Sequence, residues 1–329
     1  MAKLTVSLAG VSYDRTRAIF DGSVRIDGCE VIAHPMTPEE AFTRALSHQE
    51  FDITELSMSN YMTLTARGEN PYIGVPAFVS RMFRHSGIYI RSDKGIERPE
   101  DLKGKVMGVP EYPMTAALWI RGILQDEYGV AASDLQWRVG GQEVPISKPR
   151  ISIELPPSIS VERISGDSTL NGMLDSGNLD AIMSARAPSC LETNDKVVRL
   201  FPNYRADEEA YFAKTGMFPI MHLIAIRRSL VEQHPWLPVH VYRAYLEARS
   251  ICYQRLGEVG HLYTMLPWPV DEFDRARELM GDDYWRYGVN NNGKEIEAMT
   301  RYAFEQGLTD RKLSPKELFA PSTLDMTGH

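Results

Sequence analysis

The 329-residue sequence predicts an α/β protein of two lobes, each a sheet flanked by helices, with a ligand cleft between the lobes. Strand-like runs alternate with helical segments over the first 79 residues, which is typical of a parallel sheet covered on both faces. The chain is long enough for two domains, since single cores stop growing near ~250–300 residues. Residues 80–86 (SRMFRHS) form a cationic segment between two apolar, β-rich runs, which suggests a crossing between lobes.

The first predicted lobe follows from β-branched and aromatic runs separated by capped helices. At 37–40 (TPEE), a capping threonine precedes proline at the first helical position, a pattern that starts helices. We expect strands at 4–9, 29–34, 51–57 and 72–79, and helices at 16–22, 37–48 and 59–68.

The second predicted lobe begins after Tyr89 and ends near Tyr211, where the chain returns to the first lobe. Its expected elements are strands at 105–109, 135–139, 179–185 and 197–201 and helices at 116–128 and 168–176. A strand over 218–226 and helices at 240–256, 270–280 and 294–306 then complete the first lobe, before a weakly structured tail at 311–329. Residues 140–160 contain four prolines and form an insertion that no pattern places. The predicted lobes are therefore 1–87 with 211–329, and 88–210.

Composition narrows the class of partner. The net charge of −8 argues against nucleic acid, whose phosphates need a basic surface, but allows a local basic cleft for a small anion. No stretch approaches the ~20 apolar residues of a membrane helix, and the N-terminal residues do not resemble an export signal. Cys29, Cys190 and Cys252 are too few and too scattered for a disulfide framework or a zinc motif. We therefore expect a cytoplasmic protein without membrane or nucleic-acid partners.

Candidate site residues follow from the rule that ligands bind beyond the carboxyl ends of strands in open α/β sheets. The rule and the cationic crossing together select Tyr13, Asp14, Arg15, Glu55, Ser57, Asn60, Arg81, Arg84, His85, Tyr112, Thr115 and Arg186. His222 joins them as a histidine within the apolar strand predicted over 218–226.

Each candidate has a structural alternative. Ser57 and Thr115 stand at predicted helix starts, which attract anions, yet ordinary capping explains most such residues. Arg81 and Arg84 can cover apolar surface with their stems, and Arg186 can form a surface ion pair. His85 and His222 can be core residues with satisfied hydrogen bonds rather than acid–base groups.

Several catalytic signatures are missing from the sequence. It contains no phosphate-binding glycine loop, no HExxH pair and no GxSxG nucleophile turn. We predict no cofactor and no metal ligands, and metal dependence stays open because ligands can be scattered along a chain.

Longer motifs carry a family resemblance over nearly the whole chain. They are 51–57 (FDITELS), 80–86 (SRMFRHS), 115–122 (TAALWIRG), 218–222 (FPIMH), 266–268 (LPW) and 283–289 (DYWRYGV). In these motifs the sequence resembles the 4,5-dihydroxyphthalate decarboxylase family. The resemblance implies the fold of type 2 periplasmic solute-binding proteins, which agrees with the two predicted lobes.

The resemblance also implies an activity, the conversion of 4,5-dihydroxyphthalate into 3,4-dihydroxybenzoate and CO2. Each carboxylate of that ring has a para hydroxyl, whose ionisation allows the ring carbon to be protonated. The expected roles are carboxylate or phenolate binding for Arg81, Arg84 and Arg186, and hydrogen-bond donation for Ser57 and Thr115. His85 or His222 would be the proton donor and Glu55 or Asp14 its partner or base, with Arg15 as a further anion-binding group.

Two other functions fit the same two-lobe clamp. One is a non-catalytic solute-binding protein for a small carboxylate, against which the missing export signal weighs. The other is an enzyme of another kind on this fold. The partner in each case is a small molecule, anionic and aromatic for the decarboxylase, and homo-oligomer formation is left open.

Overall fold

The computed structural model describes residues 3–146 and 151–327, which form two compact units. Unit 1 comprises Met1–Arg81, Ile220–Ile296 and Leu313–His329, and unit 2 comprises Met82–Pro219 and Glu297–Lys312. Both units are α/β, as predicted.

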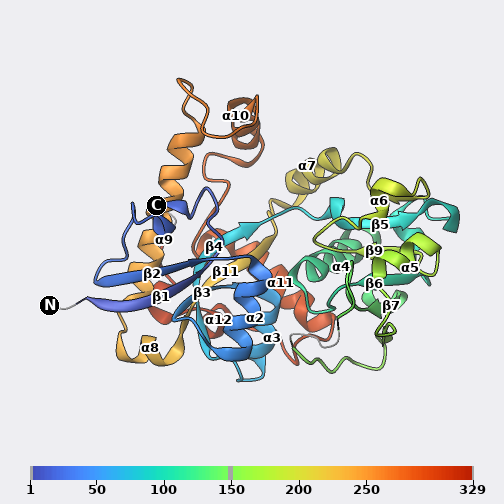
Figure 1. Ribbon diagram of the computed structural model, residues 1–329, viewed down its shortest axis with the longest axis horizontal. Coiled ribbons are helices and arrows are strands. Elements are labelled where there is room, and N and C mark those ends of the chain that lie inside the picture. Colours follow the sequence, from blue (N-terminus) through green and yellow to red (C-terminus); the bar gives the residue numbers. More distant parts are fainter. Residues whose placement is uncertain (1–2, 147–150, 328–329) are drawn as a thin grey trace. The chain divides into compact units, whose positions relative to one another are not determined.

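Unit 1 is built on a five-stranded mixed sheet with the order β2-β1-β3-β11-β4 (Figure 1). Strand β1 pairs with β2 and β3 in parallel, whereas β11 pairs with β3 and β4 antiparallel. The strands predicted within the first 79 residues, β1 to β4, all run in the same direction, as expected, and the sheet is mixed because β11 enters from the distant segment after Pro219 and runs antiparallel to β3 and β4. The strands are β1 (Leu4–Gly10), β2 (Cys29–Pro35), β3 (Ile53–Ser57), β4 (Tyr72–Arg81) and β11 (Ile220–Arg227).

Helices cover this sheet. Helix α2 packs on β1 and β3, α3 packs on β11, and the long α9 packs on β4 and α1. The α2 start was predicted correctly, since the Thr37 side chain accepts a hydrogen bond from the Glu40 N–H. The helices are α1 (Arg17–Phe20), α2 (Pro38–His48), α3 (Met58–Ala66), α8 (Arg228–Gln233), α9 (Leu237–Leu256), α10 (Pro269–Met280) and α12 (Pro315–Leu318), with the first turn of α11 (Gly293–Glu305).

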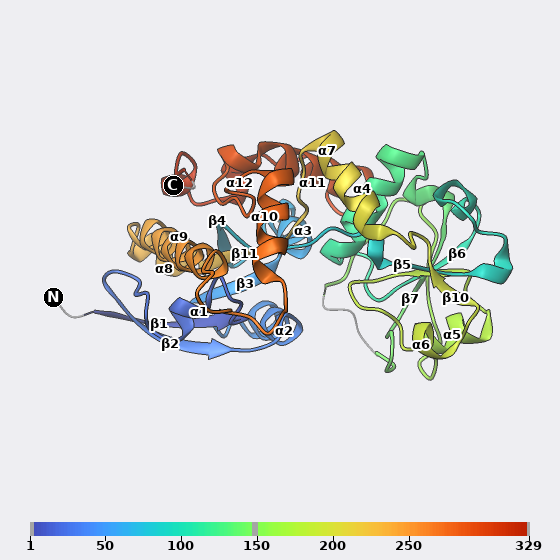
Figure 2. The same ribbon diagram turned by 90° about the horizontal axis from the view of Figure 1, so that it is seen from above.

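Unit 2 contains a six-stranded mixed sheet with the order β10-β5-β9-β6-β7-β8. Its strands are β5 (Ile88–Arg91), β6 (Val106–Val109), β7 (Gln136–Val139), β8 (Val161–Arg163), β9 (Ala181–Met183) and β10 (Val197–Arg199). Helix α4 (Thr115–Tyr128) lies on one side of this sheet, and α5 (Leu170–Ser176) and α6 (Cys190–Thr193) lie on the other (Figure 2). Helices α6 and α7 (Tyr204–Thr215) and strand β8 have no counterpart among the predicted elements.

The bounds of the units differ from those of the predicted lobes. Unit 2 extends from Met82 to Pro219 and takes in 297–312, most of α11. The reason is packing between α11 and α4: the Tyr302 hydroxyl donates to Asp126 at 2.6 Å, and Arg121 Nε donates to the Gln306 side chain at 2.6 Å. The ring of Tyr302 occupies the space that a side chain at Gly122 would fill.

The C-terminal segment is part of the core of unit 1, so the prediction of a weakly structured tail was wrong. Leu318 and Phe319 are fully buried, and Phe319 forms a β-bridge with Gly74. The Tyr61 hydroxyl donates to the Leu318 carbonyl at 2.5 Å. These partners are far from the tail in sequence, so no local pattern indicated them.

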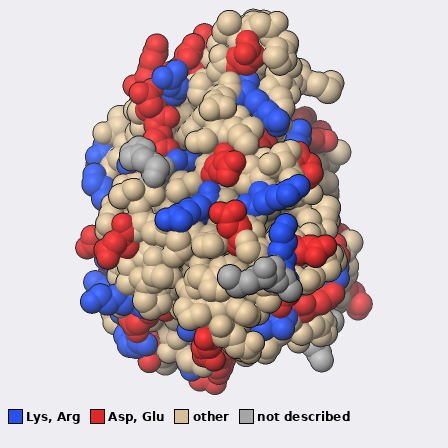
Figure 3. Space-filling view, turned by 90° about the vertical axis from the view of Figure 1, so that its left-hand side faces the viewer, with Lys and Arg blue, Asp and Glu red and all other residues tan. Residues whose placement is uncertain are grey.

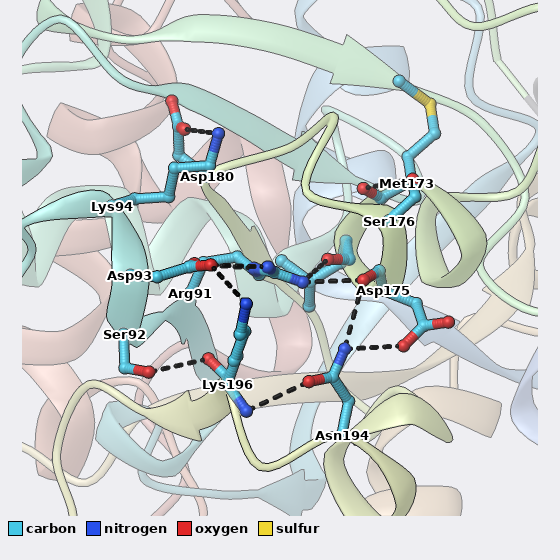
Figure 4. A network of polar contacts seen from close by, with 11 residues as sticks. Arg91, Ser92, Asp93, Lys94, Met173, Asp175, Ser176, Asp180, Asn194 and Lys196 are labelled. Atoms are coloured by element: carbon cyan, nitrogen blue, oxygen red, sulfur yellow. Dashed lines mark hydrogen bonds and ion pairs between the residues drawn. The ribbon is translucent and has the colours of Figure 1, made fainter.

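Arg91 stands at the centre of a network of polar contacts in unit 2 (Figure 4). The Arg91 guanidinium binds both carboxylate oxygens of Asp93, at 2.9 and 2.7 Å. Its Nη1 donates to the Asp175 carbonyl at 2.6 Å, in the last turn of α5, where carbonyls lack helical partners. Lys196 lies 3.4 Å from Asp93 and adds a second cation. This cluster is structural, and it ties α5 to β5.

The surface carries charges of both signs. On the face shown in Figure 3, basic and acidic side chains are interspersed. Among the helices of the described residues, none is both long and apolar enough to cross a membrane.

Candidate functional site

A hydrogen-bonded chain of three side chains in unit 1 forms the centre of the candidate site. The Nδ1 atom of His222 lies 2.6 Å from Oε1 of Glu55, and the Tyr13 hydroxyl donates to the same oxygen at 2.9 Å. The second carboxylate oxygen accepts from the Val11 N–H at 3.0 Å. Glu55 is 1% exposed, whereas the His222 side chain is 16% exposed. The carboxylate is therefore enclosed, and the imidazole reaches the surface of the site.

Strand pairing explains why these groups meet. His222 on β11 pairs with Ser57 on β3 and with Ser80 on β4, with register shifts on either side of the β4 pair. Glu55 and Ser57 are two residues apart on β3 and so share one face of the sheet. Glu55 and His222 are thus diagonal neighbours across adjacent antiparallel strands, close enough for long side chains to touch.

The electrostatics of Glu55 favour its ionised form. Burial alone would raise its pKa, but the hydrogen bonds from His222, the Val11 N–H and Tyr13 outweigh burial and hold the pKa below its usual value. Burial and the neighbouring carboxylate raise the pKa of Tyr13, so this phenol stays protonated and donates. Because Glu55 is an acceptor, Nδ1 of His222 carries a hydrogen. Its other ring nitrogen, Nε2, is then the atom that can exchange a proton with a ligand.

The missing side chain at Gly10 leaves space for the Glu55 carboxylate. A Cβ atom at position 10 would lie 3.2 Å from both Cβ and Oε2 of Glu55, a tight approach. On the imidazole side, the Phe42 ring packs edge-on against His222 with 4.9 Å between centroids. The pair is therefore confined by β1 on one side and by α2 on the other.

Arg15 is held rigidly next to this chain. Its guanidinium carbon lies 4.1 Å from the centroid of the Tyr13 ring and 4.0 Å from that of Trp285, so both rings provide cation–π contacts. Its Nε donates to the Val79 carbonyl at 2.6 Å, and Nη1 pairs with Asp14 at 3.1 Å. The Arg15 side chain is 15% exposed and is thus a fixed, partly accessible cation, suited to a carboxylate. Tyr13 joins Arg15 to Glu55 and His222 in one site.

Arg81 lies elsewhere in unit 1, in a buried ion pair. Its guanidinium is 3.6 Å from Glu295, with side-chain exposures of 0% and 1%. It also donates to the Arg286 carbonyl at 2.7 Å and to the Asn292 side chain. Burial lowers the pKa of Arg81 to about 10, so the group is charged at neutral pH and is neutralised by Glu295. The contacts of Arg81 explain its position without a ligand.

Arg84 and His85 belong to unit 2 and are buried, at 7% and 2% exposure. Burial lowers the pKa of Arg84 to about 10, and burial lowers the pKa of His85 to about 4. His85 packs edge-on against Phe201 and Tyr211, with centroids 5.1 and 5.4 Å apart. Such a histidine is neutral at physiological pH, which suits a core residue better than a proton donor.

The other predicted residues are distributed as follows. Ser57 precedes the first residue of α3 and is 5% exposed, and Thr115 is the first residue of α4 and is 2% exposed; neither helix start has a side-chain cap. Arg186 is exposed in unit 2, and its carbonyl accepts from the Gln142 side chain at 3.1 Å. The structure therefore brings together Asp14, Arg15, Glu55 and His222, with Ser57 beside His222 in the sheet.

Two residues gained importance in the structure. Tyr13 was selected only by its place after the first strand, and Trp285 appeared only within the motif 283–289 (DYWRYGV). Tyr13 is two residues from Arg15 in the sequence, and this proximity could have indicated that Tyr13 belongs to the same site. Trp285 meets Arg15 only through the fold. Among the described residues, no group of three or more His, Cys, Asp or Glu side chains is arranged to hold a metal ion.

Comparisons with known proteins give a coherent picture, although no family model matches the sequence. A 4,5-dihydroxyphthalate decarboxylase from Comamonas testosteroni is 41% identical over 326 residues, which cover 99% of each chain. A 4,5-dihydroxyphthalate decarboxylase from Pseudomonas putida is 50% identical over 190 residues, 58% of this chain and 74% of that protein.

Solved structures share the fold at low sequence identity. The periplasmic sulfonate-binding protein SsuA from Methylobacillus flagellatus has a TM-score of 0.59 at 14% identity, over 98% of this chain and 92% of that one. The desulfurization enzyme DSZB has a TM-score of 0.52 at 13% identity, over 98% of both chains. SsuA from Escherichia coli has a TM-score of 0.51 at 12% identity, over 99% of this chain and all of that one. The predicted periplasmic-binding-protein-like fold is confirmed.

Proposed function

This chain belongs to the 4,5-dihydroxyphthalate decarboxylase family, and from this premise we propose that it converts 4,5-dihydroxyphthalate into 3,4-dihydroxybenzoate and CO2. Membership confirms the predicted enzyme class, a carboxy-lyase. The observation that supports a site in unit 1 is the continuous contact from Arg15 through Tyr13 and Glu55 to His222.

Binding comes first in the proposed mechanism. The guanidinium of Arg15 holds the carboxylate that the product retains, with two parallel hydrogen bonds. Because the rings of Tyr13 and Trp285 both contact the guanidinium and the Val79 carbonyl accepts from its Nε, little side-chain freedom is lost when the substrate binds. The aromatic ring is thereby placed against the exposed part of His222.

The two acidic candidates, Glu55 and Asp14, have different roles in the proposed proton transfers. Glu55 already accepts three hydrogen bonds, so it acts as the partner that orients His222. Asp14 is more accessible, with 35% of its side chain exposed, and takes the proton from the hydroxyl para to the departing carboxylate. His222 Nε2 then delivers its proton to the ring carbon that carries this carboxylate.

The atoms balance without a co-reactant. Protonation of the ring carbon forms a dienone in which the former phenolate oxygen is a carbonyl. The bond to the carboxylate then breaks, its electron pair restores the aromatic ring, and CO2 leaves. The phenolate regains its proton from Asp14, and His222 is reprotonated by solvent. One proton is consumed for each CO2 released.

The direct test is to incubate the purified protein with 4,5-dihydroxyphthalate and to follow CO2 and 3,4-dihydroxybenzoate. Stoichiometric formation of both supports the proposal. Saturable binding of the substrate without either product would overturn it and favour a solute-binding protein.

We further propose a cytoplasmic location and, as partner, a small anionic aromatic molecule. The three cysteines are free and buried, which fits a reducing compartment. Cell fractionation tests the location, and light scattering of the purified protein tests whether it forms a homo-oligomer.

A further inference from the structure

A cavity of about 400 Å³ is lined by residues of unit 2, and none of them takes part in the proposed mechanism. This volume is in the range of small-molecule sites, which are mostly apolar with a few polar groups. Its floor is formed by β7 and β8, which pair in parallel with Val139 opposite Arg163. Val139, Val161 and Arg163 face the same side of the sheet because residues in register or two apart share a face.

The outer wall comes from residues 151–155, which belong to the insertion that no sequence pattern places. In the segment 151–155 (ISIEL), apolar and polar residues alternate, and Ile151, Ile153 and Leu155 line the cavity. Ile151 is 8% exposed and therefore packed, although no neighbouring strand pairs with this segment in the described residues. Residues 151–155 thus cover an apolar hollow.

The far end of the wall is fixed by the end of α11. A Cβ atom at Gly307, which has a φ of 73°, would overlap Pro156 and come within 3.5 Å of Leu155. The chain at 155–156 thus lies directly on the backbone of position 307. This close approach holds the wall in place over β7 and β8.

The charged groups of the lining indicate the ligand. Arg163 donates one hydrogen bond, to the Ile146 carbonyl at 2.7 Å, and no carboxylate among the described residues pairs with it. Its guanidinium therefore keeps donors for a carboxylate. Glu111 is the acidic residue of the described lining; it would repel a second carboxylate but accept hydrogen bonds from hydroxyl groups.

We propose that this cavity is a second binding site, for a single-ring aromatic monocarboxylate with hydroxyl substituents. The ring lies among the isoleucine, leucine and valine side chains, with its carboxylate at Arg163 and its hydroxyls toward Glu111. The product 3,4-dihydroxybenzoate has this chemistry, and its identification as a ligand rests on the proposed function.

Calorimetric titration of the full chain with 3,4-dihydroxybenzoate tests the site, because this compound is not consumed. Arg15→Gln serves as the background, since it weakens the unit 1 site. We expect this variant to bind the probe, and adding Arg163→Gln to weaken Kd by about tenfold, the cost of a charged hydrogen bond. Ile153 is a half-buried residue of the wall, and Ile153→Trp would fill the cavity. In the Arg15→Gln background it should also weaken the Kd for the probe by about tenfold.

Arg138→Gln is the matched control, because Arg138 lies next to Val139 on the opposite face and pairs with Glu162 at 3.0 Å. Arg138→Gln should leave the Kd for 3,4-dihydroxybenzoate unchanged. Phthalate is a dianion and should bind about tenfold more weakly than 3,4-dihydroxybenzoate, which is a monoanion. Benzoate distinguishes the hydroxyl contribution: binding as tight as that of 3,4-dihydroxybenzoate would overturn the role of Glu111.

The inference is overturned if Arg15→Gln abolishes all binding, or if Arg163→Gln and Ile153→Trp both leave Kd unchanged. Turnover of 4,5-dihydroxyphthalate is measured in parallel. A wild-type chain that binds the probe in the cavity but releases no CO2 would contradict the proposed function alone. A wild-type chain that releases CO2 but does not bind the probe in the cavity would contradict this inference alone.

Discussion

The carboxylate of Glu55 and the imidazole of His222 lie 2.6 Å apart, although 167 residues separate them in the chain. The contact joins a strand from the beginning of unit 1 to one that returns to it after Pro219. It fixes the orientation of a histidine whose side chain is 16% exposed, and it is the contact most easily tested by mutation.

Replacing His222 by Gln should lower kcat by roughly 100-fold or more, because general acid catalysis contributes about 10²–10⁴-fold. Glu55→Gln should also lower kcat, since the amide no longer fixes the imidazole orientation as a charged acceptor. Steady-state turnover measures both, with the melting temperature as a check on folding. His48→Gln, on an exposed helix end, is the control and should behave like the wild type. Full turnover in a folded His222→Gln variant would contradict the assignment.

Replacing Arg15 by Gln should raise KM by about tenfold or more, since a charge-assisted bond to the carboxylate is lost. Arg15→Lys should recover only part of this loss, because an ammonium group cannot make the planar double hydrogen bond. Initial rates over a range of substrate concentrations separate KM from kcat. The exposed neighbour Arg17 supplies the control Arg17→Gln. An unchanged KM in Arg15→Gln would remove Arg15 from the site.

Replacing Arg81 by Met should destabilise the protein by about 3 kcal/mol, because Glu295 would stay buried with less compensation. Arg286, 3.1 Å from Glu295, limits the loss. The double variant Arg81→Met/Glu295→Met should recover part of it, since no buried charge of that pair remains. Urea unfolding measures these differences. Arg205→Met, which breaks an exposed pair with Glu209, should cost less than about 0.5 kcal/mol.

His85 should make the folded state less stable in acid. Burial lowers its pKa to about 4, so between pH 6.5 and 4 the unfolded chain binds a proton that the folded chain does not. Stability therefore falls as the pH falls through this window, by about 3 kcal/mol for a shift of this size. His85→Phe should be less sensitive to pH from 7 to 4.5 in urea unfolding. Equal pH dependence in both proteins would show that folding does not lower the pKa of His85.

Local patterns predicted much of the fold and only part of the site. The strands at Leu4–Gly10 and Tyr72–Arg81 and the capped helix from Pro38 follow from residues adjacent in sequence, and their types were predicted correctly. The antiparallel insertion of β11 and the burial of Leu318 depend on contacts between distant segments, which periodicity does not encode.

The site residues also differ in whether local sequence or a contact between distant segments determines their role. Arg15 and Asp14 were found because they follow a strand, and Glu55 because it stands near the carboxyl end of one, where α/β proteins place their sites. Arg81 was selected by its position in a cationic segment, but its partner Glu295 stands on a distant helix and could not be inferred. Glu55 was expected as a partner for a histidine, and only the structure shows that the histidine is His222.

The tight approach between position 10 and the Glu55 carboxylate has an evolutionary consequence. A bulkier residue at position 10 would require the Glu55 side chain to shift by a few tenths of an ångström, and the imidazole that it orients would shift with it. We therefore expect the residues at positions 10, 55 and 222 to vary together among sequences related to this chain.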